Sequence, residues 1–199
     1  VEDRVWLMRR YYGIQEVVVA PFDAMQRMPW EDFVTQYLAG ELGVTCVMQP
    51  FVRGRKDVEN LRQALDQRGL NIPIMAKIES RQGVERLDEI LSAADRLCIA
   101  RGDLGNTMPL WQLPGVQKRI ARRCREEKKP FCLVTQLLWS MQENPVPTRA
   151  EVADIYNGVL DGAAALMLTG ETAIGKHPVQ AMTYLVKTAR CAMEDMGKD

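Results

Sequence analysis

Short runs of β-branched and other apolar residues recur along this chain, and segments of helical length separate them. The starts of these runs lie roughly 25 to 35 residues apart, which is the length of one strand–helix unit. Strands that alternate with helices predict an α/β fold, in which helices cover a parallel sheet. The predicted strands are Val17–Ala20, Val44–Met48, Ile72–Ala76, Leu97–Ala100, Phe131–Val134 and Ala164–Leu168.

The segments between the runs place apolar residues three and four positions apart, as in amphipathic helices. A closed (β/α)8 barrel needs eight strands and typically about 250 residues, whereas this chain has 199 residues. We therefore expect parallel βα units of a TIM-type barrel, arranged as a partial barrel of about six strands. Two alternatives are an open sheet and a barrel that a second chain completes. The predicted helices are Asp57–Arg68, Gln82–Ala94, Gln117–Glu127 and Val179–Met193.

Charge and hydropathy argue against two classes of partner. The chain has 26 Lys and Arg residues and 26 Asp and Glu residues, so its formal net charge is zero. This balance gives no reason to expect nucleic acid or an anionic membrane as a partner. No apolar run approaches the roughly 20 residues that span a bilayer, and the charged start of the sequence does not resemble a signal peptide.

The cysteine and histidine content narrows the chemistry. Five cysteines are an odd number and form no C-x-x-C pair, so neither a disulfide framework nor a zinc finger is predicted. Free cysteines within apolar runs are typical of a reducing compartment, which predicts a cytoplasmic protein. His177 is the only histidine, which argues against sites built on several imidazoles. Carboxylates, lysine, hydroxyls and backbone groups must then supply the chemistry.

Polar clusters follow four of the predicted strands. Carboxyl ends of parallel strands meet at one edge of a sheet, where active sites of barrels and open α/β sheets lie. Each cluster alone is more typical of a solvated loop or turn than of a functional site, but their convergence favours a functional site. The clusters are Lys77 with Glu79, Arg101-Gly102-Asp103, Thr135-Gln136 and Thr169-Gly170-Glu171.

The residue types in these clusters indicate a particular chemistry. Glu79 and Asp103 are hard oxygen ligands that suit Mg2+ or Mn2+. Lys77 offers a positive charge for a phosphate or a developing enolate oxygen. The backbone N–H groups of Gly102 and Asp103 could bind a carboxylate if they open a helix. Neither G-x-x-x-x-G-K-[ST] nor G-x-G-x-x-G occurs in the chain, so the common nucleotide-binding fingerprints are absent.

Four stretches resemble the pyruvate kinase family, in the family's order and over about residues 44–196. IMAKIESRQGVERLDEIL is similar to the family's lysine strand and the helix that follows it, and IARGDLGNTMPLWQLPGVQKRI to its metal-binding strand end. VTCVMQPFVRGRKDVENLRQAL resembles the unit before the lysine strand. The stretch that begins VTQLLWSMQENPVPTRAEVADIYNG resembles the part that closes the barrel.

The resemblance implies a role for each matching residue. Lys77 would be the catalytic lysine, and Glu79 and Asp103 would hold Mg2+ or Mn2+. Gly102 and Asp103 would bind the substrate carboxylate, and Thr135 would contact substrate and support proton transfer. The implied activity is the glycolytic transfer of a phosphoryl group from phosphoenolpyruvate to ADP, which gives pyruvate and ATP. The family also uses K+, but most of its K+ ligands lie in strands that do not appear here.

Departures from the family pattern leave other functions open. The first three barrel strands, the lid domain and the C-terminal regulatory domain do not appear in this sequence, so activity of this chain alone is an open question. The alternative is an inactive partial barrel, or an oligomerising interaction module that retains a metal site. A further alternative is a phosphoenolpyruvate-dependent enzyme that condenses the enolate instead. A partial barrel exposes apolar edges, which predicts a homo-oligomer.

The first 44 residues do not resemble pyruvate kinase. We divide the chain into residues 1–43, a βα segment, and residues 44–199, the part that resembles half of a pyruvate kinase barrel. Residues 1–44 are similar to a stretch of bacterial riboflavin kinase/FMN adenylyltransferase, in a PFD turn, an MPWEDFV segment and a closing LGV. No adenylyltransferase chemistry is expected, because the nucleotide-binding motifs are absent. The alternative is that this segment is a divergent βα unit of the same barrel.

Overall fold

A parallel sheet forms the centre of the structure, a computed structural model that describes residues 46–197. Its five strands follow one another in chain order, and the pairings of β2 with β3, β3 with β4 and β4 with β5 are parallel. The predicted α/β fold with a parallel sheet is confirmed, whereas the predicted strand Val17–Ala20 lies outside the described residues. The strands are β1 Val47–Gln49, β2 Ile74–Ile78, β3 Arg96–Ala100, β4 Phe131–Val134 and β5 Ala165–Met167.

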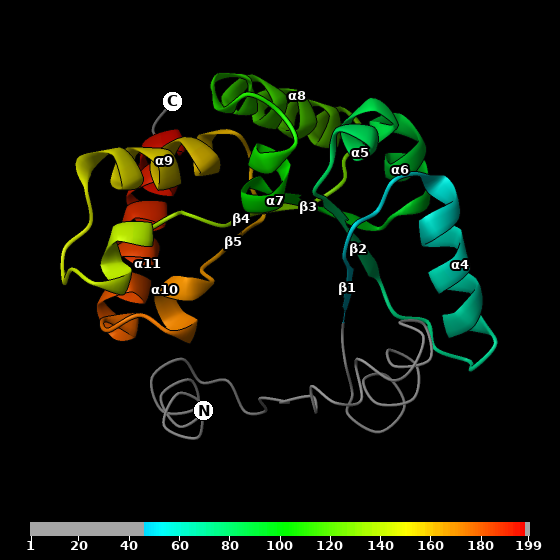
Figure 1. Ribbon diagram of the computed structural model, residues 1–199, viewed down its shortest axis with the longest axis horizontal. Helices are drawn as coiled ribbons and strands as arrows, with labels where there is room; N and C mark the ends of the chain where they lie inside the picture. Colours follow the sequence, from blue (N-terminus) through cyan, green and yellow to red (C-terminus); the bar gives the residue numbers. More distant parts are fainter. Residues whose placement is uncertain (1–45, 198–199) are drawn as a thin grey trace. The chain divides into compact units, whose positions relative to one another are not determined.

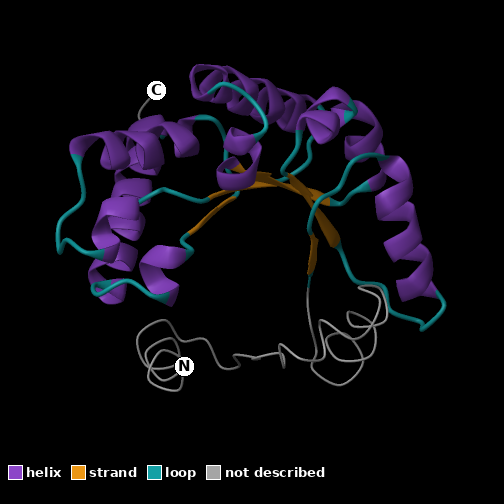
Figure 2. Ribbon diagram, in the orientation of Figure 1, coloured by secondary structure: helices purple, strands orange, loops and turns teal. Residues whose placement is uncertain are grey.

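Helices alternate with the strands, as in a partial α/β barrel. The described residues group into two compact units, one of residues 48–60 with 73–197 and a smaller one of Val47 with 61–72. In the larger unit, α5, α6 and α8 lie on one side of the sheet, and α11 packs on α9 (Figures 1 and 2). The helices are α4 Arg55–Asp66, α5 Arg81–Glu85, α6 Leu87–Ala93, α7 Arg101–Asn106, α8 Leu113–Glu126, α9 Arg149–Leu160, α10 Gly170–Ala173 and α11 Pro178–Met196, with short 3-10 helices η2 Leu110–Gln112 and η3 Trp139–Gln142.

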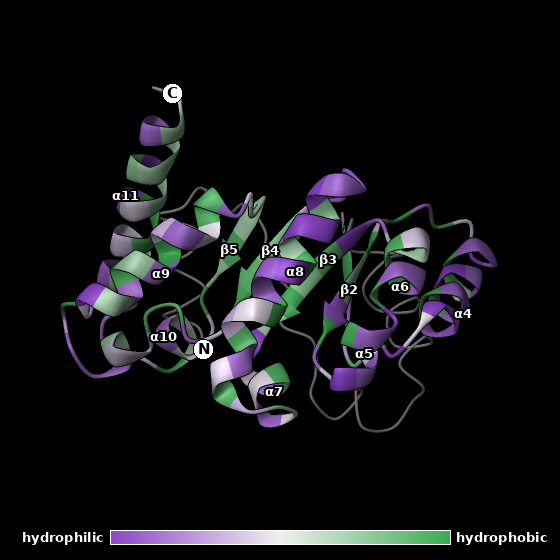
Figure 3. Cartoon of the chain, turned by 90° about the horizontal axis from the view of Figure 1, so that it is seen from above, coloured by the Kyte–Doolittle hydropathy of each residue, from purple (hydrophilic) through white to green (hydrophobic). Residues whose placement is uncertain are grey.

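The two faces of the sheet differ in how deeply their residues are buried. In β2, Ile74, Ala76 and Ile78 are fully buried, whereas Met75 and Lys77 between them are partly exposed. This alternation arises because successive side chains of a strand point to opposite faces. In Figure 3, the strands are mainly coloured as hydrophobic, and α8 shows hydrophilic residues on its outer surface. The burial pattern is therefore that of a sheet covered by amphipathic helices.

Two helix predictions needed correction. The predicted helix Gln82–Ala94 is two helices, α5 and α6, which separate at Arg86 (φ −103°, ψ 26°). α9 was not predicted, although its start carries a complete capping box. The Thr148 hydroxyl accepts from the N–H of Glu151, and the Glu151 carboxylate accepts from the N–H of Thr148. Pro145 and Pro147 just before this helix are typical of a loop, whereas Thr148 and Glu151 form the T-x-x-E pattern of a helix start.

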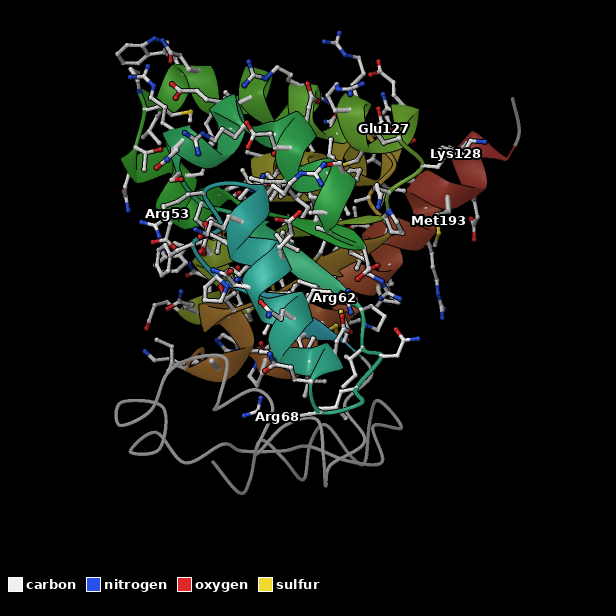
Figure 4. The ribbon with its side chains drawn as sticks, turned by 90° about the vertical axis from the view of Figure 1, so that its right-hand side faces the viewer. Arg53, Arg62, Arg68, Glu127, Lys128 and Met193 are labelled. Carbon is white, nitrogen blue, oxygen red and sulfur yellow. The ribbon has the colours of Figure 1, made fainter. Side chains whose placement is uncertain are left out.

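Backbone groups at the ends of helices find local partners. After α8, Lys128 adopts a positive φ of 53° and its N–H donates to the carbonyl of Arg125 at 3.1 Å. Figure 4 marks Glu127 and Lys128 at this turn. Within the smaller unit, the Arg62 side chain (Figure 4) donates to the carbonyl of Ile72 at 2.8 Å. Such contacts satisfy carbonyls that the helices leave without intrahelical partners.

Candidate active site at the carboxyl edge of the sheet

The residues predicted from four polar clusters follow neighbouring strands at one edge of the sheet. The register pairs Ile78 of β2 with Ile99 of β3, and Ala100 of β3 with Val134 of β4. The strands therefore end nearly level. Because the strands are parallel, the residues that follow them emerge on the same edge. The structure thus gathers the polar ends of β2, β3 and β4, which are distant in sequence.

Lys77 and Glu79 form an ion pair at the end of β2. Lys77 Nζ lies 2.5 Å from Glu79 Oε1, and the Glu79 side chain is fully buried while that of Lys77 is 23% exposed. The other oxygen, Oε2, accepts the backbone N–H of Phe51 at 2.6 Å. Phe51 follows β1 in a left-handed conformation (φ 51°), which non-glycine residues rarely adopt. A buried carboxylate needs such partners, because burial of an unpaired charge is costly.

Thr135 links the end of β4 to the end of β3. Its hydroxyl accepts the N–H of Gly102 at 2.6 Å and donates to the carbonyl of Val134 at 2.6 Å. Thr135 has a φ of 73°, and Gln136 follows it with a φ of 54°. A β-branched residue in this region is strained, and such strain gathers at functional sites. The Gly102 N–H, which was predicted to bind a carboxylate, therefore already has a partner in this structure.

Arg101 holds Thr135 in this conformation and was not among the predicted site residues. Its Nη2 and Nε atoms lie 2.8 and 3.3 Å from the Thr135 carbonyl oxygen. Its Nη1 atom lies 2.7 Å from a carboxylate oxygen of Asp154 on α9. The Arg101 side chain is only 10% exposed. The sequence marked Arg101 as part of a strand-end cluster, but Asp154 could not be assigned while α9 was missed.

Glu171 is a second buried carboxylate at the same edge that the sequence analysis left out of the site. It follows β5 and is fully buried. Its carboxylate accepts the N–H of Leu138 at 3.1 Å and the N–H of Thr169 at 2.9 Å. These bonds join the end of β5 to the segment that follows β4. Glu171 is thus saturated by backbone donors, which indicates a structural role.

The two carboxylates predicted as metal ligands differ in how far their oxygens are engaged. Glu79 Oε1 makes its ion pair with Lys77 without a well-oriented hydrogen bond. Asp103 is exposed, and its carboxylate has no hydrogen-bond or ion-pair partner within residues 46–197. No group of three or more His, Cys, Asp or Glu side chains suited to a metal occurs in the described part of the chain. A pair of carboxylates nevertheless fits Mg2+, which takes its other ligands from water and substrate oxygens.

A cavity of about 440 Å³ lies beside the strand ends, between α8 and α9. Arg101, Gln136, Lys118 and Asp154 are among the residues that line it. Lys77 and Glu79 do not line it. The cavity and the lysine–carboxylate pair are therefore distinct features, and the chemistry is assigned to the pair. Among the helices of residues 46–197, none combines the length and apolar character that a membrane span requires.

Comparison with known proteins agrees with this arrangement. The family described as "Pyruvate kinase, barrel domain" matches residues 28–182. The chain is 46% identical over 155 residues to a pyruvate kinase of Mycobacterium intracellulare, a match that covers 78% of this chain and 33% of the relative. It is 47% identical over 150 residues to a pyruvate kinase of Schizosaccharomyces pombe, covering 75% of this chain and 30% of the relative.

The matches also extend into the N-terminal segment. The family match begins at residue 28. A pyruvate kinase of Chlamydia trachomatis is 43% identical over 177 residues, which cover 88% of this chain and 36% of the relative. Part of residues 1–43 is therefore included, while the division at residue 44 and the origin of the segment stay predictions. The chain spans about a third of the length of these curated relatives.

Proposed function

Because this chain belongs to the pyruvate kinase family, we propose that its strand-end site serves phosphoryl transfer from phosphoenolpyruvate to ADP. The observation that carries the proposal is the Lys77–Glu79 ion pair, in which a fully buried carboxylate holds a partly exposed lysine at the sheet edge. Phosphoryl transfer depends on positioned charges rather than on covalent chemistry by the protein. A rigidly held ammonium group beside carboxylates meets that need.

Lys77 is assigned the central electrostatic role. Its ammonium group would stabilise the charge on the transferring phosphoryl group and on the enolate oxygen that remains. In the structure Nζ lies against Glu79 Oε1. A cation that takes this oxygen as a ligand would compete with Nζ and release it toward the substrate. In the absence of metal and substrate, the ion pair would therefore hold Lys77 at the site.

Glu79 and Asp103 would hold the divalent metal through carboxylate oxygens, and Glu79 Oε1 would exchange its ion pair with Lys77 for the metal. Mg2+ or Mn2+ bound there would neutralise charge on the phosphoryl oxygens. Asp103 lies in the first turn of α7, next to Gly102. Whether K+ takes part depends on ligands from other strands of the family's barrel.

Thr135 and Gly102 would act together on the substrate. The Gly102 N–H donates to the Thr135 hydroxyl in this structure. A substrate carboxylate that binds Gly102 and Asp103 would replace that hydroxyl as the acceptor. The released hydroxyl could then contact substrate and support protonation of the enolate. Arg101 would keep the Thr135 carbonyl fixed during the exchange, because it bonds the backbone rather than the side chain.

The alternative function is a partial barrel without turnover, which binds metal and associates with further copies. This alternative is favoured because the chain spans only about a third of the length of each relative. Under either function we place the protein in the cytoplasm and expect a homo-oligomer. Neither function involves nucleic acid or a membrane.

The experiment that separates the two functions measures pyruvate formation from phosphoenolpyruvate and ADP, with Mg2+ and K+. Lys77→Met removes the charge and keeps most of the side-chain volume, and Lys187→Met on α11 is the matched control. Pyruvate formation that Lys77→Met abolishes and Lys187→Met retains supports phosphoryl transfer. Formation of a condensation product contradicts it, as does turnover that persists in Lys77→Met. Absence of pyruvate formation by the wild type contradicts turnover by this chain and favours the partial barrel without turnover.

A further inference from the structure

Sulfur atoms gather on the face of the sheet that carries Lys77. Cys98 of β3 and Cys132 of β4 are register partners, so their side chains lie next to each other on one face. They are 0% and 3% exposed. Three partly buried side chains pack against the cluster that contains this pair, and all three are methionines: Met48, Met75 and Met167. Five sulfur-bearing side chains, which we call the sulfur cluster, thus share one small region.

The two thiols interact as a polar pair rather than as two apolar fillers. The pKa of the Cys98 thiol is raised, first by its hydrogen bond with Cys132 and then by burial. The same hydrogen bond lowers the pKa of Cys132, against the effect of burial. Lys77, the register partner of Cys98, favours a thiolate there through its charge, whereas Glu79 opposes it. As register partners on neighbouring strands, the two sulfurs are placed to share a metal ion.

The spacing of the strands suits a bridging ion. Neighbouring strands lie about 4.8 Å apart. Two metal–sulfur bonds of about 2.3 Å place their sulfurs about 4.0 Å apart in trigonal coordination and about 4.6 Å apart in linear coordination. Side chains of register partners can meet either value by rotation about χ1, without a shift of the backbone. Thiolate and thioether ligands select Cu(I) over hard cations such as Mg2+.

We propose that Cys98 and Cys132, with a thioether of the sulfur cluster as a third ligand, form a binding site for a soft monovalent cation of the Cu(I) type. Binding exchanges the two thiol protons for one cation, so that Cu+ and two thiols give a bis-thiolate complex of charge −1 and two protons released to water. Lys77, on the same face, compensates that charge. The site shares Lys77 with the phosphoryl-transfer proposal, but its ligands are sulfur atoms and include neither Glu79 nor Asp103.

The test offers Cu(I) to the full chain under argon, with ascorbate, against a chromophoric Cu(I) chelator. The wild type is expected to remove one Cu(I) per chain from the chelator. Cys98→Ala and Cys132→Ala are each expected to weaken binding at least tenfold. Cys124→Ala, a buried thiol on α8, and Cys191→Ala, an exposed thiol on α11, are matched controls that retain it. The proposal is overturned if Cys132→Ala binds Cu(I) as tightly as the wild type. It is also overturned if Cys191→Ala loses as much affinity for Cu(I) as Cys132→Ala does.

A second measurement does not depend on the folding of cysteine variants. X-ray absorption at the copper edge of the loaded wild type is expected to show sulfur ligands alone, at about 2.3 Å. Replacement of Met48, Met75 and Met167 by leucine keeps side-chain volume and removes the thioethers. That variant is expected to bind Cu(I) several-fold more weakly, with one sulfur fewer in its spectrum. Nitrogen or oxygen ligands in the wild type, or an unchanged spectrum in the variant, would contradict the site.

Discussion

Single residues at the strand ends adopt conformations that only their partners explain. Thr135 has a positive φ of 73° although it is β-branched. Its hydroxyl bonds Gly102 and Val134, and its carbonyl bonds Arg101. These bonds offset a backbone strain of the order of 1–3 kcal/mol. The side chain proposed to contact substrate is therefore also the one that holds β3 and β4 together.

Replacement of Thr135 by valine should separate these roles. Valine keeps the β-branched shape but cannot accept the Gly102 N–H, and an unsatisfied buried donor costs about 1–3 kcal/mol. We expect the free energy of unfolding in urea to fall by that amount. Thr135→Ser keeps the hydroxyl and removes a methyl group, so it should unfold at a urea concentration close to that of the wild type. If the valine and serine variants are equally stable, the hydrogen bond from Gly102 does not contribute to the free energy of unfolding.

Arg101 offers a second test at the scale of a residue. Its guanidinium bonds the Thr135 carbonyl through two nitrogens and Asp154 through a third. Lysine cannot reproduce this fork. We expect Arg101→Lys to destabilise the fold by about 1–3 kcal/mol in urea unfolding, because lysine leaves part of these hydrogen bonds unmade. Arg122→Lys on α8, whose ion pair with Glu126 is exposed, should cost less than about 0.5 kcal/mol; similar losses for both variants would contradict this account.

Elements were predictable from the sequence where local patterns decide them. β3 and β4 have continuous apolar stretches, and their predicted ranges match within a residue. α9 was missed because its capping residues lie next to prolines, and α7 because its six residues are too few for a periodic pattern. Lys77, Glu79 and Asp103 were singled out because they lie at the ends of predicted strands, although β2 extends to Ile78 and therefore includes Lys77. Their roles stay predictions. The contacts of Thr135 with Gly102 and Arg101 were not, since they depend on the left-handed turn after β4.

The start of α9 should give the protein an acid-sensitive element. Burial opposes the charged form of the Glu151 carboxyl, but hydrogen bonds from Ser140 and Thr148 outweigh it, so its pKa is lowered. A carboxyl with a lowered folded pKa stabilises the fold above its unfolded pKa of about 4.3, and this stability is lost as the pH falls through the folded value.

Glu151→Gln should therefore be less stable than the wild type in urea at pH 7. The difference should shrink as the pH falls below about 4.3. Glu85→Gln, which alters an exposed ion pair with Arg81, is the control and should show no such pH-dependent difference. A gap between Glu151→Gln and the wild type that stays constant from pH 7 to pH 3 would contradict the assigned role of the carboxylate.

At the scale of the whole molecule, β5 forms one edge of the sheet that residues 46–197 build. β5 is the last strand in the sheet order, and within residues 46–197 it pairs only with β4. Ala165 of β5 is exposed. An unpaired edge strand is a template for pairing with another chain. The proposed homo-oligomer would use this edge.

Light scattering after size-exclusion chromatography tests the association. We expect a mass above that of one 22.6 kDa chain at micromolar concentration. Ala165→Lys, which places a charge on the edge strand, should shift the mass toward the monomer. A charge in η2 instead of on the edge strand, introduced as Gln112→Lys at an exposed position, should leave the mass unchanged. A monomeric wild type across the micromolar range would contradict the proposal.

Binding of Mn2+ to the full chain, followed by electron paramagnetic resonance, tests the central claim that the carboxyl edge of the sheet is a metal-dependent phosphoryl-transfer site. The account predicts one bound Mn2+ per chain, tightened by oxalate, whose two carboxylates imitate the enolate product. Glu79→Gln and Asp103→Asn should each weaken binding at least tenfold, whereas Asp88→Asn on α6 should not. Absence of Mn2+ binding above background, or equal binding by Glu79→Gln and the wild type, would contradict it.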